Sequence, residues 1–397
     1  MKWLVMKILN ENSKQGPLLE VVVTARPSWA RVKHLVFNYA TVAGRDRVRL
    51  TLVGPAVSQR YGDISKRLPK WLQFDIVQAL NESDALDAVA LSCVSGSMSL
   101  INKWSRNRPD CVLVVADRTE TLGASLAASL MQIPLIHLQG GEISGSIDDK
   151  VRDANSKLAD FHLTTNEITA NRLRELGEKD DLIRVVGCPS VDIVAEVLNN
   201  QSRLTFTSSS SLGGVGSDFP MDKDFGIIMF HPDTLNAEEN ILWTRQLIEF
   251  TQNSYLNWVW FWPNPDHGSH EISHEIRMAR EQIELHNIRF IVNLPPEDFV
   301  ILAINSTVLI GNSSFGIREA SFVGLPVVNL GRRQFGRQKA KNVLDIPSLL
   351  TFEEFSTLVE NHLQHGKFAS SHIYGSGNSG LIAAKAILNW SPNVKVR

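Results

Sequence analysis

The sequence predicts an α/β protein built from two units, each a mainly parallel sheet covered by helices on both faces. Short apolar runs alternate with longer segments of helical pattern, which is typical of parallel strands that are buried on both faces. The alternation stops at a Ser- and Gly-rich segment, residues 204–219, and then restarts. A chain of 397 residues is also too long for a single ordinary core.

Apolar runs bounded by turn residues are predicted to be the strands of the two units. In the first unit these runs are residues 18–24, 48–54, 111–117, 134–138, 161–165 and 183–187. In the second unit they are residues 225–231, 257–263, 288–293, 307–312 and 325–330. Helical patterns between strands include residues 121–132 and 168–178. Ligands of such folds bind beyond the carboxyl ends of the strands, so we expect a binding cleft between the two units.

Composition limits the function classes that need to be considered. The formal net charge of -2 provides no overall attraction to nucleic acid or to anionic lipid. Cys93, Cys111 and Cys188 are not clustered, which favours small buried side chains in a reducing compartment. The apolar N-terminal stretch is interrupted by Lys7, and no apolar run reaches about 18 residues, so we expect a cytoplasmic protein without a membrane span.

One strand-to-helix connection in the second unit has the composition of a phosphate site. The stretch LIGNSSFGIREASFVGLP, residues 309–326, places small residues between an apolar strand and a helical pattern. Backbone N–H groups at a helix start and two hydroxyls bind anions, although a serine N-cap gives the same pattern. A basic stretch, residues 331–339, follows the next strand and is either part of that site or a solvated surface.

A second stretch, residues 270–274, matches the H-E-x-x-H pattern of zinc proteases. The match is short and no third ligand follows, so we interpret His270 and His274 as surface residues at a polar helix start. We expect no metal site.

Acidic residues follow two strands of the first unit. Asp117 and Arg118 end one strand, and IHLQGGEISGSIDDKVRD, residues 136–153, follows the next. Parallel strands end at one edge of a sheet, so Asp117 and Glu142 are expected on the same rim, where acids can perform acid–base chemistry. Two alternatives stay open at this point. Asp117 and Arg118 can form a structural ion pair, and Asp148 and Asp149 can be acids that favour a helix start.

Taken together, these motifs resemble the UDP-N-acetylglucosamine 2-epimerase family, in particular its hydrolysing branch. The resemblance covers nearly the whole chain after about residue 19. It is carried by TARPSW, ADRTET, HLQGGEISGSIDDKVRD, VGCPSVD, HPDT, PNPDHGS, LPPEDF, GNSSFGIREA, NLGRRQFGRQ and YGSGNSG. The segments GGEISGSID and GNSS are similar to the hydrolysing branch, whereas the non-hydrolysing branch has different residues there.

The resemblance implies the GT-B architecture, two Rossmann-like domains with an interdomain cleft. The corresponding domains would be residues 1–200 on the sugar side, a linker at residues 201–222, and a nucleotide-binding domain at residues 223–397 whose last helix packs back on the first domain. The implied reaction removes the C2 proton of a UDP-linked 2-acetamido sugar, eliminates UDP and adds water to the glycal. This reaction requires no cofactor or metal. The resemblance also implies a homodimer or homotetramer that acts in sialic-acid or other surface-glycan synthesis.

The family's functional positions can be carried over onto this sequence. The resemblance implies catalytic roles for the acids Asp117 and Asp148, with Glu142 as the acid that would compensate for Gln139. The substrate-binding residues it implies are Arg26, Arg118, His137, His231, Asn264, Ser313, Ser314, Gly316, Glu319 and Arg333.

Several polar positions near the expected sugar pocket depart from the family pattern. Gln139 stands where hydrolysing members often carry a catalytic glutamate, and an amide exchanges no proton at neutral pH. Asp153 stands in place of a histidine, Ala56 in place of another, and Ser28 in place of an acid. Two alternatives to the epimerase therefore stay open: a nucleotide-sugar-binding relative without epimerase activity, and a GT-B glycosyltransferase.

Overall fold

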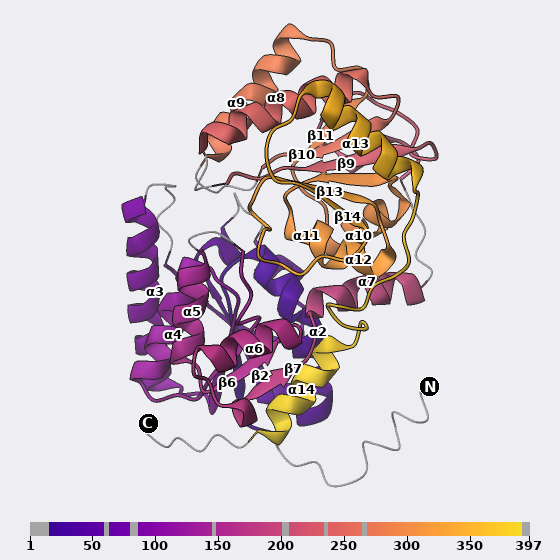
Figure 1. Ribbon diagram of the computed structural model, residues 1–397. Coiled ribbons are helices and arrows are strands. Elements are labelled where there is room, and N and C mark those ends of the chain that lie inside the picture. Colours follow the sequence, from indigo (N-terminus) through magenta and orange to yellow (C-terminus); the bar gives the residue numbers. More distant parts are fainter. Residues whose placement is uncertain are drawn as a thin grey trace. The chain divides into compact units, whose positions relative to one another are not determined.

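The computed structural model describes residues 16–58, 63–79, 86–144, 148–200, 206–233, 237–263 and 268–390. The chain divides into two compact units. The first unit comprises Met1–Glu142, Asp148–Asp192 and Gly375–Arg397, and the second comprises Ile143–Ile147 and Ile193–Tyr374. Each unit contains one sheet with helices packed on it, which confirms the predicted α/β class (Figure 1). The boundary predicted at residue 200 stays a prediction.

The first sheet has seven parallel strands in the order β3-β2-β1-β4-β5-β6-β7. Their bounds are β1 Leu19–Val23, β2 Val48–Val53, β3 Gln73–Val77, β4 Cys111–Val115, β5 Leu135–Leu138, β6 Phe161–Thr164 and β7 Ile183–Val185. Every residue of the central strands β1, β2, β4 and β5 is buried, as their continuous apolar runs predict. Strand β3 was not predicted because it is an edge strand with a mostly exposed, mixed sequence.

Helices cover both faces of this sheet, because side chains of successive strand residues point to opposite faces. The helices of the first unit are α2 Arg26–Ala43, α3 Leu86–Arg106, α4 Thr119–Leu130, α5 Asp148–Leu158, α6 Glu167–Glu175 and α14 Ser379–Asn389. Helix α7, Pro189–Asn199, begins in the first unit and continues into the second. Val21 and Val23 belong to a core with α2 and α14, whereas Val22 belongs to a core with α3 and α4. The start of α14 is fixed by Asp192, whose carboxylate accepts hydrogen bonds from the N–H groups of Ser379 and Gly380 at 2.9 and 2.7 Å.

The second sheet also has seven strands, in the order β14-β13-β12-β9-β10-β11-β8. Their bounds are β8 Val215–Gly216, β9 Phe225–Met229, β10 Asn257–Phe261, β11 Ile288–Ile291, β12 Val308–Gly311, β13 Val327–Leu330 and β14 Val343–Ile346. All neighbours are parallel except β8, which comes from the Ser- and Gly-rich segment and pairs antiparallel with β11. Strand β14 is at the other edge and, like β3, lacked a continuous apolar run.

The helices of the second unit are α8 Ala237–Asn253, α9 Ser269–Gln282, α10 Pro296–Asn305, α11 Ser314–Ile317, α12 Glu319–Val323 and α13 Phe352–Gln364. Trp258 and Trp260 of β10 pack in a core with α8, α9 and α13, and Val259 between them packs in the opposite core with α10 and α12. Among the described residues, no helix is both long and apolar enough to cross a lipid bilayer.

Candidate active site

Two neighbouring strands of the first unit end in an unusual backbone conformation. Ala116 follows β4 with φ 61°, and Gln139 follows β5 with φ 66°, a region that residues other than glycine rarely adopt. The carbonyl oxygen of Ala116 accepts hydrogen bonds from His137 Nε2 at 2.9 Å and from Asn155 Nδ2 at 3.2 Å. These contacts fix the turn that presents Asp117 at the carboxyl edge of the sheet.

His137 has no exposed surface, and both of its ring nitrogens are engaged inside the protein. Nε2 lies 2.9 Å from the Ala116 oxygen, and Nδ1 lies 3.0 Å from the Ser156 hydroxyl. Burial lowers the pKa of His137 to about 3, so the ring is neutral: Nε2 donates to the carbonyl and Nδ1 accepts from the hydroxyl. In this arrangement His137 positions the turn after β4, and the substrate contact expected from the sequence stays a prediction.

A buried arginine, Arg152, forms hydrogen bonds with several acidic residues of the first unit. Arg152 on α5 has a side chain that is 1% exposed. Its Nη1 donates to the Glu142 carbonyl oxygen and to Asp149 Oδ1, both at 2.6 Å, and its Nη2 donates to Asp117 Oδ2. Burial alone would lower the pKa of Arg152, but the neighbouring acids outweigh it and raise the pKa above its ordinary value. Asp117, Glu142 and Asp149 are therefore brought together around one positive charge.

Sequence reasoning missed Arg152. It directly precedes Asp153, one of the departures from the family pattern, and its signal was a basic residue which, with Lys150, stands among the acids of residues 142–153. Asp117 forms an ion pair with this arginine of another element, and Arg118 forms one with Glu120.

The remaining acids of the segment have different surroundings. Asp148, like Asp149, occupies the first turn of α5, where acidic side chains favour the helix N-terminus. Asp153 forms a two-pronged ion pair with Arg172 of α6, at 2.7 and 2.6 Å. A paired carboxylate thus stands where the resemblance implies a histidine.

Gln139 is 1% exposed, and its side-chain amide forms a hydrogen bond with a cysteine sulfur. Its Nε2 donates to Cys188 Sγ at 3.0 Å, and Cys188 Sγ lies 2.9 Å from the Ser190 hydroxyl. Its Oε1 is buried and has no hydrogen-bond partner within the described parts of the chain. The position at which the resemblance implies a catalytic glutamate therefore holds a neutral amide with one unsatisfied acceptor, which is an energetically unfavourable arrangement unless a donor reaches it.

Two arginines predicted to bind substrate lie elsewhere in the first unit. Arg118 is 41% exposed, and its Nε lies 3.1 Å from Glu120 Oε2. Arg26 is the first residue of α2, and its pKa is lowered by burial and by the charge of Arg67. Of the departures from the family pattern, Ser28 lies within 3.4 Å of the Thr24 hydroxyl and Ala56 is fully buried.

In the second unit, Asn312 connects the carboxyl ends of three strands. Its side chain makes two hydrogen bonds with the backbone of His231, at 2.8 and 2.7 Å. Its carbonyl oxygen accepts from Arg333 Nη1 at 3.2 Å and from Gln334 Nε2 at 2.9 Å. Burial, followed by the Arg333 charge, lowers the pKa of His231 to about 3, so this histidine is a neutral group beside a guanidinium.

The predicted phosphate turn is built from two short helices rather than one. The first, α11, begins at Ser314 and the second, α12, begins at Glu319. Ser313 is the N-cap of α11 and accepts from the Phe315 N–H at 3.4 Å, while the Ser314 hydroxyl accepts from Arg318 Nη2 at 2.8 Å. The predicted single helix is thus interrupted at Arg318, a fully enclosed cation that sequence reasoning did not single out.

Glycines let this turn pack closely. A Cβ on Gly311, which has φ 146°, would lie 2.0 Å from the Met229 carbonyl oxygen. A Cβ on Gly316 would lie 2.9 Å from Val327 Cγ1. Gly316 therefore brings α11 onto β13, and its backbone N–H is bonded to the Ser313 carbonyl oxygen at 3.1 Å.

Within the second unit, Gly336 of the basic loop lies close to Ile143. Residues 331–339 follow β13 as predicted, and a Cβ on Gly336 would lie 2.4 Å from Ile143 Cγ2. Ile143 directly follows Glu142 in the chain but belongs to the second unit. The basic loop and the start of the 143–147 segment are therefore in van der Waals contact.

The other predicted residues add no metal chemistry. Asn264 lies outside the described residues. His270 and His274 are exposed on α9, as expected for surface residues. Across the described ranges, no group of three or more His, Cys, Asp or Glu side chains is arranged to hold a metal ion.

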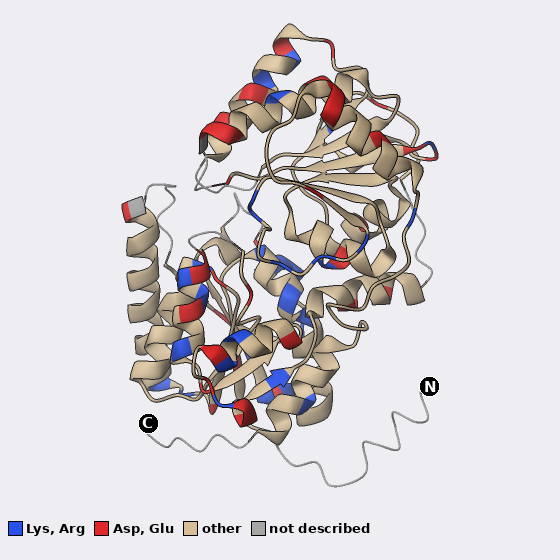
Figure 2. Cartoon of the chain, viewed as in Figure 1, with Lys and Arg blue, Asp and Glu red and all other residues tan. Residues whose placement is uncertain are grey.

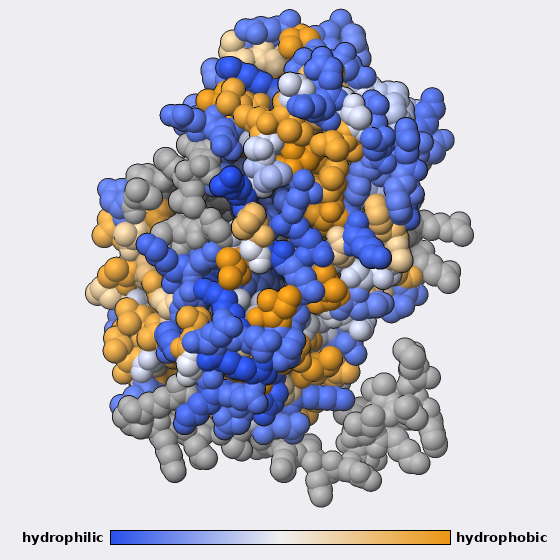
Figure 3. Space-filling model, viewed as in Figure 1, coloured by the Kyte–Doolittle hydropathy of each residue, from blue (hydrophilic) through white to orange (hydrophobic). Residues whose placement is uncertain are grey.

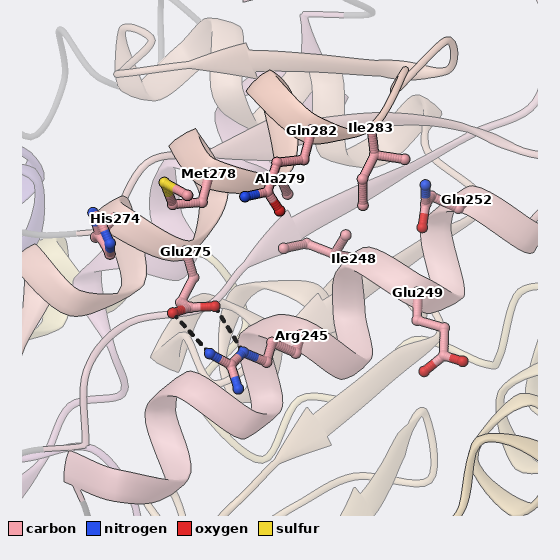
Figure 4. Close-up of a pocket in the computed structure, with 10 residues that line it drawn as sticks. All are labelled: Arg245, Ile248, Glu249, Gln252, His274, Glu275, Met278, Ala279, Gln282 and Ile283. Carbon is pink, nitrogen blue, oxygen red and sulfur yellow. Dashed lines mark hydrogen bonds and ion pairs between the residues drawn. The ribbon is translucent and has the colours of Figure 1, made fainter.

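One pocket of the second unit is lined by none of these strand-end residues. It has a volume of about 540 Å³ and lies between α8 and α9, where Arg245 and Glu275 form an ion pair at 2.7 Å (Figure 4). Of the residues predicted to bind or react with substrate, none lines this pocket. Its exposed, mixed lining does not resemble the strand-end sites described above.

Comparison with known proteins gives these sites a context. The family described as UDP-N-acetylglucosamine 2-epimerase matches residues 42–388. The hydrolysing UDP-N,N'-diacetylbacillosamine 2-epimerase of Legionella pneumophila is 34% identical over 271 residues, 68% of either chain. The UDP-N-acetylglucosamine 2-epimerase of Neisseria meningitidis serogroup B is 30% identical over 276 residues, again 68% of either chain.

Solved structures share the fold. The crystal structure of UDP-GlcNAc 2-epimerase from Neisseria meningitidis bound to UDP-GlcNAc has a TM-score of 0.75, with 19% identity, and the match covers 93% of this chain and 99% of that one. This similarity confirms the expected two-domain α/β architecture.

Proposed function

This chain belongs to the UDP-N-acetylglucosamine 2-epimerase family, and from this premise we propose that it is a hydrolysing 2-epimerase of UDP-linked 2-acetamido sugars. The observation that carries the proposal is the Arg152 cluster, which holds Asp117 and Asp149 and the backbone of Glu142 around one buried guanidinium. Similarity to a relative named as hydrolysing supports release of a free sugar rather than of an epimeric nucleotide sugar.

The reaction has two chemical stages. A base removes the proton at C2, and the C1–oxygen bond to the diphosphate breaks, which leaves a glycal and UDP. Water then adds across the double bond: its hydroxyl goes to C1, and a proton goes to C2 from the opposite face. The products are UDP and the free 2-epimer, so atoms balance with one water consumed.

We assign the proton transfers to acids of the first unit. Asp117 and Asp148 are the proposed acid–base pair, with Glu142 as the nearest further carboxyl group. Arg152 orients Asp117 through the hydrogen bond that its Nη2 donates to Asp117 Oδ2. Gln139 contributes hydrogen bonds only, because an amide does not exchange protons at neutral pH.

The nucleotide is assigned to basic and hydroxyl groups. Ser313, Ser314 and Arg333 would contact the diphosphate, and Glu319 would accept hydrogen bonds from the ribose. Stabilisation of the departing diphosphate by fixed positive charge is expected to be a large contribution to catalysis. Arg26, Arg118, His231 and Asn264 complete the proposed nucleotide-binding residues, and Gly316 contributes backbone only.

A nucleotide-sugar-binding protein without turnover is the second candidate. It is favoured by Gln139, whose side chain is buried and bonded to Cys188 at the position where the resemblance implies a catalytic carboxylate. In that case UDP sugars would bind in calorimetry but release no UDP, and Gln139→Glu would restore release.

The deciding experiment is incubation with UDP-N-acetylglucosamine and, separately, with UDP-N,N'-diacetylbacillosamine in heavy water. We expect UDP release, with deuterium at C2 of the free epimer. Asp117→Asn should abolish release, whereas Asp180→Asn, an exposed carboxylate in the same unit, should not change it. If the protein releases UDP from neither nucleotide sugar, the proposal that it hydrolyses these two substrates is wrong.

Assembly and location belong to the same proposal. We propose a homodimer or homotetramer acting in the cytoplasm.

A further inference from the structure

Phe335 is an exposed aromatic residue in the basic loop of the second unit, residues 331–339. The residue is 71% exposed. Single apolar residues are common on protein surfaces, as the scattered orange residues of Figure 3 show, so exposure alone does not mark a site. The setting of Phe335 is different, because the loop is anchored on both sides of it and carries positive charges only.

The residues that flank Phe335 are fixed by contacts within the second unit. Gln334 is 2% exposed, and its Nε2 donates to the Asn312 carbonyl oxygen at 2.9 Å. Gly336 packs so closely on Ile143 that a Cβ on Gly336 would lie 2.4 Å from Ile143 Cγ2. The loop therefore holds an apolar ring in water between two anchored neighbours.

The backbone of Phe335 is hydrogen-bonded as well. Its N–H donates to the Arg332 carbonyl oxygen at 2.9 Å, and its own carbonyl oxygen accepts from Lys339 Nζ at 3.4 Å. Lys339 is paired in turn with Asp345 of β14 at 2.6 Å, and its Nζ lies 5.9 Å from the centre of the Phe335 ring. An aromatic side chain on such a fixed backbone loses little conformational freedom when it contacts a ligand.

The charges of the basic loop suit an anionic ligand. Between positions 331 and 339 the charged residues are Arg332, Arg333, Arg337 and Lys339, and none is acidic (Figure 2). An apolar ring beside cations matches a ligand that is anionic at one end and apolar at the other. Under the proposed function Arg333 contacts the diphosphate, so Phe335, two residues later, is expected to meet the part of the substrate next to the diphosphate.

The contact at Gly336 indicates that this part is the sugar. Ile143, on which Gly336 packs, follows Glu142 directly in the chain, and neighbouring Cα atoms are about 3.8 Å apart. Glu142 is among the acids assigned to the sugar, whereas the ribose is assigned to Glu319 on α12. Ile143 is itself apolar and 42% exposed. Phe335 therefore lies in the part of the loop between the diphosphate cation and the contact nearest to the sugar acids.

The two nucleotide sugars of the proposed function differ in how apolar the sugar is. N-acetylglucosamine has a hydroxyl group at C4 and a hydroxymethyl group at C5. N,N'-diacetylbacillosamine has an acetamido group and a methyl group at these two carbons. It therefore has two further methyl groups, which an aromatic ring can cover, and it lacks two hydroxyl groups, to which the ring offers no hydrogen bond.

We infer that Phe335 is a specificity-determining residue, which packs on the substituents at C4 and C5 of the sugar and favours the diacetamido sugar over N-acetylglucosamine. The inference rests on the proposed function, because it requires that a UDP-linked 2-acetamido sugar binds to the chain. It narrows the substrate class to UDP sugars that are apolar at these two carbons.

The test compares the affinities for UDP, UDP-N-acetylglucosamine and UDP-N,N'-diacetylbacillosamine by calorimetry, and kcat/KM for the two sugars by UDP release. The wild-type chain should favour the diacetamido sugar roughly tenfold. Phe335→Ser should remove this preference and change the affinities for UDP and UDP-N-acetylglucosamine by less than about twofold. Phe335→Leu keeps an apolar side chain and should retain most of the preference.

Tyr255→Ser is the matched control. Tyr255 is an aromatic residue of the same unit that is 80% exposed, and it lies just before β10, at the edge of the sheet opposite to the basic loop. The preference of Tyr255→Ser should equal that of the wild type. Circular dichroism and urea unfolding check that both exposed substitutions leave the fold intact.

Three results would overturn the inference. The first is a wild-type chain that binds the two nucleotide sugars equally or binds neither, and the second is Phe335→Ser with the wild-type preference. The third is an equal loss of affinity for UDP and both sugars in Phe335→Ser, which would place the ring on the nucleotide. The binding preference is measured without turnover, so binding without UDP release would contradict the proposed hydrolysing activity and leave this inference standing.

Discussion

Arg152 and Asp117 form an ion pair in which the arginine side chain is 1% exposed and the aspartate side chain is 18% exposed. The two residues come from different elements, the start of α5 and the turn after β4. An enclosed guanidinium is tolerated only when its donors are satisfied, and here two carboxylates and one carbonyl satisfy them. The pair therefore couples the fold of the first unit to the geometry of its acids.

Arg152→Met should destabilise the protein strongly. The methionine keeps much of the side-chain length but leaves Asp117 and Asp149 without their shared donor, and removing one partner of a buried pair costs about 3–5 kcal/mol. Arg172→Met is the matched control, because its partner Asp153 is 31% exposed, and a pair this exposed contributes about 0–1 kcal/mol. Urea unfolding of both variants measures the difference, and equal losses would show that the Arg152 cluster has no special role in stability.

Stability should fall in acid partly because of His137. Its pKa is about 3 in the folded protein and about 6.5 in the unfolded chain, so below pH 6.5 the unfolded chain binds the extra proton. The contribution is complete above pH 6.5 and is lost as the pH falls towards 3, by about 1.4 kcal/mol per pH unit. His137→Gln should therefore flatten the dependence of unfolding free energy on pH between 6 and 4. The same substitution at the exposed His270 is the control, and identical slopes for wild type and His137→Gln would contradict the argument.

The central strands were predictable from sequence because their burial on both faces leaves a continuous apolar run. Strands β4 and β5 begin at or within one residue of the predicted positions. Strands β3 and β14 were not predictable from sequence, because an edge strand that is half exposed to water has a mixed sequence of polar and apolar residues. Strand position also predicted that Asp117 and Glu142 would occupy the same edge of the sheet, because parallel neighbours end together.

The contacts within the site were not predictable in the same way. Arg152 becomes the centre of the acids only when α5 folds back towards the turn after β4, and no local spacing encodes that approach. The sequence indicates only that His137 is a polar residue within an apolar run. In the structure, both of its ring nitrogens have hydrogen-bond partners inside the protein. Local sequence thus predicts which edge carries the polar groups, whereas tertiary packing decides which of them are accessible.

Gly311→Ala should lose more stability than Gly213→Ala. Both glycines have positive φ, 146° and 80°, so both substitutions strain the backbone. Only at Gly311 would the new Cβ also collide, at 2.0 Å from the Met229 carbonyl oxygen, whereas nothing lies within 4 Å at Gly213. We expect an additional loss of roughly 1–3 kcal/mol at Gly311, measured by denaturant unfolding. Equal losses would mean that the turn after β12 can shift freely to make room.

Gly336→Ala should reduce turnover with little effect on stability. The added Cβ would lie 2.4 Å from Ile143 Cγ2 and 3.0 Å from the Ile143 carbonyl oxygen. Either the basic loop or the segment that begins at Ile143 must then move, and Glu142 is the adjacent residue in the chain. We expect kcat for UDP release to fall about tenfold, because a small displacement of positioned acids is costly to the reaction. Circular dichroism and urea unfolding should change little, since Gly336 lies in a loop.

A second substitution tests whether the effect of Gly336→Ala comes from the steric clash between the new Cβ and Ile143. Ile143→Ala removes the Cγ2 atom that Gly336→Ala would meet, and Ile143 is 42% exposed, so its truncation alone should be tolerated. The double variant should therefore recover most of the turnover lost in Gly336→Ala. Recovery would establish that the basic loop positions the acidic segment through this contact. A double variant as slow as Gly336→Ala would instead place the defect in the loop itself, and the contact between Gly336 and Ile143 would then have no part in catalysis.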